Sequence, residues 1–148
     1  MPPILIDTNL LVYLYDVGSP NKAAQARKVL DRLELTRSGR LSVQCLAEFL
    51  NASTRKLDPP LSRANAFEQV SLFARMWPIF DLTPLIVLEA ARGARDHGLD
   101  YYGAQIWAAA RLNQVTVVFS EDFSDGQVLE GVRFVNPFST RFQLEDWA

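Results

Sequence analysis

The chain has 148 residues, close to the ~150 residues of an average domain, so we expect a single compact domain. Hydrophobic residues make up 49% of it and charged residues 22%, values that exclude a disordered, collagen-like or coiled-coil protein. No apolar stretch reaches the ~18 residues of a membrane span, and no basic segment precedes the apolar start at Ile4. We therefore expect a cytoplasmic protein without signal peptide or membrane contact.

The single cysteine, Cys45, and the single histidine, His97, exclude an internal disulfide and a Cys/His zinc site. They also leave a His-dependent hydrolytic triad with little support. The formal net charge is only -2, but residues 22–75 carry ten Lys/Arg and five acids, whereas the rest of the chain is acidic. This asymmetry is compatible with a basic flank for a polyanion beside an acidic pocket, and also with ordinary solvated helix faces.

The first half of the chain predicts one strand and four helices. A buried strand over residues 4–6 leads into a short helix over 10–15, and apolar residues at helical spacing predict a helix over 22–35. Residues 37–40 are expected to form a loop. The next helix runs through Lys56, and a further helix covers residues 62–74. In the helix ending at Lys56, we expect the apolar face to point inward, with residues Val43, Leu46, Ala47 and Leu50.

The second half predicts strands over residues 77–80, 116–119 and 132–135, with helices over 84–97 and 100–113. Thr83 and Asp100 are typical helix N-caps, and Gly98 is a typical helix stop. The alternation of strands and helices predicts an α/β fold, a three-layer sandwich with a central, mostly parallel sheet flanked by helices. We assign residues 1–137 to this domain and residues 138–148 to a C-terminal tail that packs on it through aromatic side chains.

Polar residues follow two of the predicted strands at the point where each strand ends. Asp7 and Asn9 come after the first strand, and Ser120 and Asp122 come after the strand over 116–119. Ligands of open α/β sheets bind at the carboxyl ends of the strands, so these side chains are candidates for a functional site.

Three further acids are candidates for the same site. Glu48 lies beside an apolar helix face, where a carboxylate is costly unless it is paired or bound to a metal. Asp100 starts a helix, and Asp125 closes the loop after Asp122. Four of the candidate acids also have a purely structural interpretation. Asp7 and Asp100 could be helix caps, Asp125 a turn residue and Glu48 a salt-bridged surface group.

Carboxylates that converge without basic neighbours repel one another unless a divalent cation neutralises them. Oxygen-only ligands select Mg²⁺ or Mn²⁺ over zinc. Such a metal suits phosphoryl or phosphodiester hydrolysis, because it activates water and stabilises the charge that develops on the phosphate and the leaving oxygen. The residues by themselves thus favour a metal-dependent hydrolase of one of these two kinds.

Four segments then resemble, in order and spacing, the sequence blocks of the PIN-domain family, in particular its VapC-like toxins of type II toxin-antitoxin modules. The blocks are residues 4–13 (ILIDTNLLVY), 42–51 (SVQCLAEFLN), 99–110 (LDYYGAQIWAAA) and 118–126 (VFSEDFSDG). The resemblance implies an endoribonuclease with an Mg²⁺ or Mn²⁺ site, a homodimer and a cognate antitoxin that silences it. Carried over residue by residue, it implies catalytic metal ligands at Asp7, Glu48 and Asp122, supported by Asn9, Ser120 and Asp125.

The third block departs from the family pattern, because Gly103 stands where the family places an aspartate. Asp100 lies one helical turn earlier and is a candidate fourth metal ligand in place of the missing acid. If Asp100 does not substitute, we expect impaired activity.

The leading hypothesis is a metal-dependent endoribonuclease, the toxin of a toxin-antitoxin module, whose RNA substrate is guided by Lys and Arg side chains of residues 22–75. The alternative is a catalytically degenerate PIN module that binds RNA or an antitoxin without turnover. A phosphatase of the haloacid dehalogenase type with Asp7 as nucleophile is disfavoured, because such a site would have another aspartate at the position of Asn9. Dinucleotide binding is disfavoured because no glycine-rich turn follows the first strand.

Overall fold

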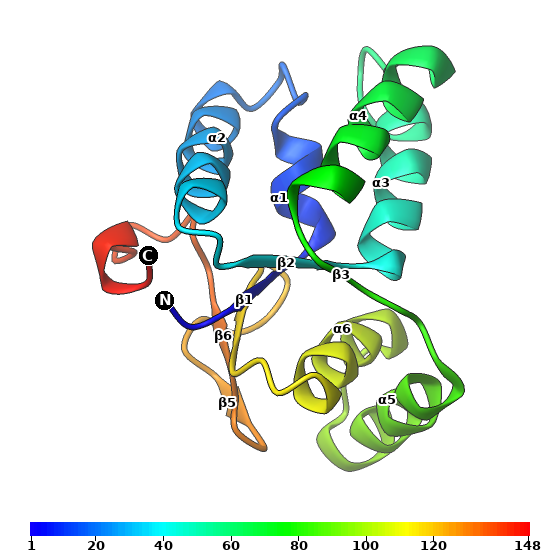
Figure 1. The fold of residues 1–148 in the computed structure, drawn as a ribbon, viewed down its shortest axis with the longest axis vertical. Helices are drawn as coiled ribbons and strands as arrows, with labels where there is room; N and C mark the ends of the chain where they lie inside the picture. Colours follow the sequence, from blue (N-terminus) through cyan, green and yellow to red (C-terminus); the bar gives the residue numbers. More distant parts are fainter.

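Two layers of helices enclose a six-stranded sheet in the computed structural model, which describes residues 1–148 (Figure 1). The strands are β1 (Ile4–Ile6), β2 (Gly39–Ser42), β3 (Ile79–Phe80), β4 (Val117–Phe119), β5 (Val128–Leu129) and β6 (Val132–Val135). The helices are α1 (Thr8–Tyr13), α2 (Pro20–Leu35), α3 (Val43–Arg55), α4 (Arg63–Met76), α5 (Pro84–His97) and α6 (Tyr101–Leu112), followed by a short 3-10 helix (Leu144–Asp146).

The sheet has the strand order β3-β2-β1-β4-β6-β5, and every pairing is parallel except that of β5 with β6. Figure 1 shows α1 to α4 on one side of the sheet and α5 with α6 on the other. The predicted three-layer α/β sandwich with a mostly parallel sheet is therefore confirmed. None of the helices is both long enough and apolar enough to cross a membrane.

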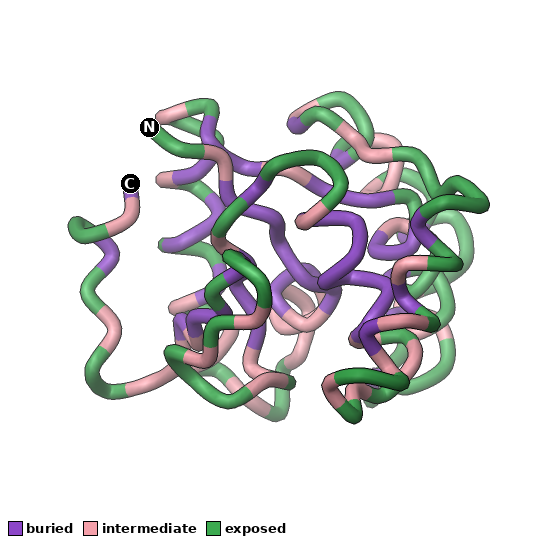
Figure 2. Tube along the Cα trace, turned by 90° about the horizontal axis from the view of Figure 1, so that it is seen from below, coloured by how far each residue is buried: buried purple, intermediate pink, exposed green.

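The core is centred on β1, which lies between β2 and β4 and is exposed by 1% or less at each residue. A strand covered on both faces reads as a continuous apolar run, which is why Ile4, Leu5 and Ile6 alone predict it. Figure 2 shows buried segments in the middle of the trace and exposed segments along the outer loops.

Most predicted elements are confirmed within two or three residues, but two strands were not predicted. β2 covers residues 39–42, where a loop was expected over 37–40, because Gly39 and Arg40 have little strand propensity of their own. Pairing with β1, which sets Gly39 beside Ile4, makes this segment a strand. β5 has only two residues and is extended only because it pairs with β6.

The predicted inward face of α3 is wrong. Val43 and Leu50 are 39% and 38% exposed, and the buried positions of the helix are Gln44, Cys45, Phe49 and Ser53. Two contacts fix this rotation of the helix: the Ser42 hydroxyl accepts from the Cys45 N–H, and the Cys45 thiol donates to the carbonyl of Ile6 at 3.3 Å. Tertiary contacts thus override a helical pattern with apolar residues on two faces.

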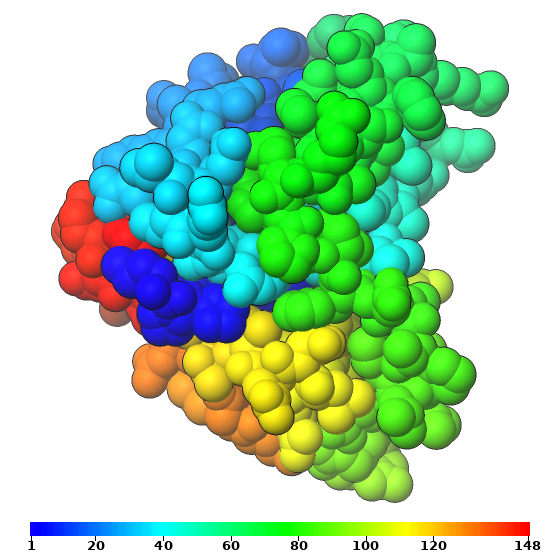
Figure 3. Space-filling model, in the orientation of Figure 1, coloured from blue at the N-terminus to red at the C-terminus, as the bar shows by residue number.

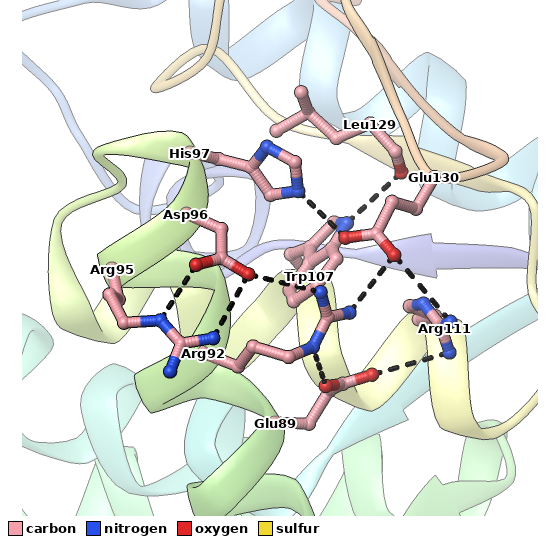
Figure 4. Close-up of polar contacts among 9 residues, drawn as sticks. All are labelled: Glu89, Arg92, Arg95, Asp96, His97, Trp107, Arg111, Leu129 and Glu130. Atoms are coloured by element: carbon pink, nitrogen blue, oxygen red, sulfur yellow. Dashed lines mark hydrogen bonds and ion pairs between the residues drawn. The ribbon is translucent and has the colours of Figure 1, made fainter.

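Ion pairs connect the hairpin of β5 and β6 to helices α5 and α6 (Figure 4). Glu130, at the hairpin turn, forms ion pairs with Arg92 at 3.0 Å and with Arg111 at 3.6 Å, and it shares a hydrogen bond with His97 Nε2 at 2.7 Å. Arg92 and then His97 lower the pKa of Glu130 to about 2. The Trp107 indole donates to the carbonyl of Leu129 at 3.1 Å, so the turn is held by both charge and a hydrogen bond.

The C-terminal residues lie against the start of the chain and α2, as Figure 3 shows. The rings of Phe142 and Trp147 meet the Phe119 ring edge to face, with centroids 5.5 and 6.1 Å away. Arg32 donates to the carbonyl oxygen of Ala148 at 2.8 Å. These contacts attach the C-terminal residues to β4 and α2.

Candidate active site

Asp7 and Ser120 lie side by side because the strands that precede them are parallel neighbours. Ile6 pairs with Phe119 in the sheet, so the next residue of each strand emerges at the same edge. The Ser120 hydroxyl donates to Asp7 Oδ2 at 2.6 Å, and the Thr8 N–H donates to Asp7 Oδ1 at 2.7 Å. Asp7 is only 6% exposed, so its carboxyl is held rigidly at the border between core and solvent.

Asn9 and Asp122 complete this group from the loops that follow β1 and β4. The Asn9 amide donates to Asp122 Oδ2 at 3.2 Å and to the Ser120 oxygen at 3.3 Å. The Asp122 N–H also donates to the Ser120 oxygen, at 3.0 Å. The Ser120 hydroxyl therefore uses its donor and both acceptor positions, and it joins all three neighbours.

Glu48 faces the same group from α3. A cavity of ≈ 350 Å³ is lined by Asp7, Glu48, Asp100 and Asp122. Glu48 is exposed, so the expectation that it lies against an apolar face is wrong, because α3 is rotated relative to the predicted face. Its Oε1 accepts from the Gln44 amide at 2.6 Å.

Asp100 lines the cavity and also caps α6, since its Oδ2 accepts from the Gly103 N–H at 3.4 Å. A Cβ at Gly103 would lie 3.2 Å from the Phe123 ring and 4.0 Å from Asp100 Oδ2. The Phe123 ring is stacked on Phe134, with centroids 3.9 Å apart. A side chain at position 103 would thus enter a space bordered by Phe123 and Asp100.

The structure does not bring Asp125 to this cavity. Its Oδ1 accepts from the Asn136 N–H at 2.9 Å, and its Oδ2 lies 3.9 Å from Arg141. Asp125 lines a different hollow near the C-terminal residues, where it connects the turn after Asp122 to the end of β6.

The cavity is strongly acidic, because four carboxylates and no Lys, Arg or His line it. The pKa of Asp7 is raised from its usual 3.8 to about 6. Burial is the main cause, the hydrogen bonds from Ser120 and Thr8 lower the pKa, and the nearby charges of Asp122 and Glu48 add smaller increases. A cation in the cavity would reverse this balance.

No three Asp, Glu, His or Cys side chains of the chain lie close enough together to hold a metal ion by themselves. The carboxylates instead face a shared cavity from the ends of β1 and β4 and from α3 and α6. Mg²⁺ is usually held by one or two carboxylates and keeps waters or phosphate oxygens as its other ligands. The donor set therefore fits a hard divalent cation that Asp7 and Asp122 or Glu48 would hold, with substrate and water completing its shell.

Sequence reasoning missed two buried glutamines beside this cavity, Gln44 and Gln105, which are 7% and 5% exposed. Gln105 stands in a run of seven consecutive buried residues of α6, and the other members of this run are apolar. A buried side-chain amide needs hydrogen-bond partners, so a glutamine within such a run is the signal that could have directed attention to it.

Comparison with known proteins identifies the family. Residues 4–124 match the PIN domain, so the chain belongs to the PIN domain family. No curated protein matches the chain in sequence.

Among solved structures, similar folds occur in a toxin-antitoxin complex from Klebsiella pneumoniae, with a TM-score of 0.66, 16% identity, and 91% of this chain and 98% of that chain covered. VapC20 of Mycobacterium tuberculosis, described as a sarcin-ricin loop cleaving toxin, gives a TM-score of 0.64 and 19% identity over 88% of this chain and 98% of that chain. DNA-bound VapBC from Salmonella typhimurium gives a TM-score of 0.66 and 19% identity over 93% of this chain and 99% of that chain. These similarities establish a shared fold.

The raised pKa of Asp7 predicts how the stability of the metal-free protein depends on pH. Between pH ~4 and ~6 the folded chain binds more protons than the unfolded chain, so its free energy of unfolding should fall as the pH rises, by up to about 3 kcal/mol. Asp7→Asn removes this effect. Urea unfolding in EDTA should show the variant gaining stability relative to the natural chain from pH 4 to pH 7.

Asp31→Asn is the control, because Asp31 is an exposed carboxylate on α2. It measures the effect of the same substitution at the surface. A stability difference between Asp7→Asn and the natural chain that does not change with pH would show that the Asp7 carboxyl is not perturbed.

Proposed function

We propose that this protein is a metal-dependent endoribonuclease that hydrolyses RNA phosphodiester bonds, and that it is the toxin of a toxin-antitoxin module. The observation that carries the proposal is the cavity with four carboxylates and no basic side chain, at the carboxyl ends of β1 and β4. PIN domains are typically metal-dependent nucleases. The structural relatives include a sarcin-ricin loop cleaving toxin and a toxin-antitoxin complex.

In this proposal Asp7, Glu48 and Asp122 bind Mg²⁺ or Mn²⁺, and Asp100 is a fourth candidate ligand. The bound ion would supply an activated water and would stabilise charge on the phosphate. The chain itself orients the carboxylates: Ser120 fixes Asp7, and Asn9 ties Asp122 to the same hydroxyl. Asp7 would then bind the ion in its ionised form.

RNA requires a positive contact beside so acidic a cavity, and Lys56 is suited to provide it. A second hollow of ≈ 280 Å³ shares Glu48 and Tyr102 with the first cavity, and Lys56 is the only basic residue that lines either of them. Tyr102 is 63% exposed on their common border, where an unpaired base could stack on its ring. These features favour RNA with unpaired nucleotides at the cleavage site.

The other basic residues of the 22–75 segment line neither of these two hollows. Arg37, Arg40 and Arg75 line a cavity near the beginning of β2 and β3, at the opposite end of the sheet from Asp7. Lys22 is paired with Glu121 at 2.8 Å and also donates to the Tyr13 hydroxyl. Within this segment, Lys56 is therefore the residue that we assign to RNA.

An antitoxin and a second copy of the chain are the proposed protein partners. Phe67 of α4 and Leu85 and Leu88 of α5 are exposed by 67% or more, and such apolar side chains on helices are typical of protein contact surfaces. Homodimerisation and antitoxin binding would both cover surfaces of this kind.

A catalytically degenerate module that binds RNA or an antitoxin without turnover is the second candidate. It is favoured by Gly103, which supplies no carboxylate at the place where the PIN pattern has one, and by the capping contact that already occupies Asp100. The two candidates differ in whether RNA is cut.

The first prediction of the ribonuclease proposal is metal-dependent cleavage of a mixed pool of structured and single-stranded RNA. Purified protein free of antitoxin should cut RNA with Mn²⁺ or Mg²⁺ and not with EDTA. Asp7→Asn should reduce cleavage by at least ~100-fold, because it replaces a rigid anionic ligand with a neutral one. Gel electrophoresis of end-labelled RNA measures this, and full activity of a folded Asp7→Asn variant would overturn the metal assignment.

A second prediction concerns the missing acid. Gly103→Asp should raise the cleavage rate and tighten Mn²⁺ binding, provided that the Phe123 ring yields by a few tenths of an ångström. Gly103→Asn is the matched control, since it fills the same space without charge and should not raise activity. If the natural chain is inactive and Gly103→Asp is active, the degenerate module is correct. Equal rates for all three chains would mean that position 103 does not limit the site.

The assignment of Lys56 predicts a change in the salt dependence of RNA binding. Lys56→Ala should weaken binding of single-stranded RNA, and the slope of log K against log salt should decrease by about 1. Lys28→Ala removes the same charge from an exposed position of α2 and should leave the slope unchanged. Fluorescence anisotropy in EDTA measures both, and equal slopes for the two variants would contradict the assignment.

A further inference from the structure

Gln44 connects the acid of α3 to the first turn of α6. Its Nε2 donates to Glu48 Oε1 at 2.6 Å and to the carbonyl oxygen of Tyr102 at 3.0 Å. Its Oε1 accepts from Gln105 Nε2 at 2.8 Å. Both glutamines are buried, whereas Glu48 is exposed to the cavity.

The chemistry of the partners fixes the direction of these hydrogen bonds. A carboxylate and a backbone carbonyl only accept, so the end of Gln44 that contacts both must be its NH₂ group. The other end of Gln44 is then its oxygen, which needs a donor, and the Gln105 group facing it must be an NH₂ group too. The orientation of both amides follows from hydrogen-bond logic, although amide nitrogen and oxygen have nearly the same shape.

Glu48 is left with one oxygen held and one free. Oε1 is bound by Gln44, while Oε2 accepts no hydrogen bond from the protein. An exposed glutamate without such a restraint would sample several rotamers and would lose that freedom on binding a cation. The Gln44 amide removes part of this cost in advance, because it holds one carboxylate oxygen in place.

We propose that Gln44 and Gln105 are positioning residues that orient Glu48 toward a divalent cation in the cavity. Gln44 acts directly on the carboxylate, and Gln105 acts by fixing the orientation of Gln44. The inference rests on the proposed function, because it assigns Glu48 to the cation, but it concerns two residues that are neither proposed metal ligands nor proposed supporting residues of the site.

The test is Mn²⁺ affinity of the full chain in the absence of RNA, measured by electron paramagnetic resonance of the free ion. Gln44→Met keeps the length of the side chain and removes both amide donors, so it should weaken Mn²⁺ binding by roughly 10- to 100-fold. Gln105→Met should weaken it less, because Gln44 remains. Gln127→Met is the matched control: Gln127 lines the same cavity and donates no hydrogen bond to a carboxylate, so its affinity should equal that of the natural chain.

A double-mutant cycle separates positioning from a general structural effect. In the Glu48→Gln background, Gln44→Met should change Mn²⁺ affinity by less than about 2-fold, because the group that Gln44 orients is no longer a carboxylate. If Gln44→Met weakens binding equally in both backgrounds, its effect does not pass through Glu48 and the inference is wrong.

A second readout needs neither metal nor a Gln44 variant. In the metal-free natural chain, the side-chain NH₂ protons of Gln44 and Gln105 should give separate NMR signals that exchange slowly with water. The Gln44 signals should move on Glu48→Gln and on Gln105→Met, and should not move on Gln127→Met. Rapid exchange of the Gln44 protons with water would overturn the proposed contacts. Gln44 signals that move neither on Glu48→Gln nor on Gln105→Met would also overturn them.

The outcomes distinguish this inference from the function on which it rests. If the natural chain binds Mn²⁺ in a way that requires Asp7, and Gln44→Met binds it equally well, the positioning role is wrong and the ribonuclease proposal stands. If the natural chain binds no Mn²⁺ while the two glutamine signals behave as expected, the metal-dependent function is wrong, and the role of the two amides toward a cation is wrong with it.

Discussion

The parallel pairing of β1 with β4 is the constraint on which the rest of the candidate site depends. It brings Asp7 and Ser120 to the same edge of the sheet, where a hydrogen bond of 2.6 Å joins them. Because side chains alternate along a strand, a shift of this pairing by one residue would turn Asp7 and Ser120 toward opposite faces. The same pairing sets Leu5 beside Val118, and both side chains are fully buried in the core. The register that packs the core is thus the same register that builds the acidic group.

A buried carboxyl held in this way carries an energetic cost in the free protein. Burial raises the pKa of Asp7, and the surrounding donors, Ser120 and Thr8, offset only part of the effect. The three other acids of the cavity, Glu48, Asp100 and Asp122, are exposed to water. The site therefore combines one rigid, destabilised group with three groups that solvent can screen, so a cation would gain most from the interaction with Asp7.

The sequence allows the fold and the acids after β1 and β4 to be predicted, for physical reasons that are local. A continuous apolar run marks a strand covered on both faces, and a polar residue directly after it marks the strand end. β2 and the rotation of α3 were not predictable in this way, because Gly39 becomes extended only by pairing with Ile4, and Cys45 becomes buried only through its contacts with Ser42 and Ile6.

The error in the rotation of α3 hid the two glutamines. With Val43 and Leu50 placed in the core, Gln44 would be outside and Glu48 would need a partner to be tolerated; in the structure Gln44 is inside and Glu48 faces the cavity. Gln44 and Glu48 are four residues apart and so lie along one line of the helix, and the observed rotation of α3 directs this line toward α6 and the cavity. The Tyr102 carbonyl then receives the second donor of Gln44 one residue before Gly103. The first turn of α6 thus restrains Glu48 through the Tyr102 carbonyl and the Gln44 amide. This contact lies next to Gly103, which has no side chain.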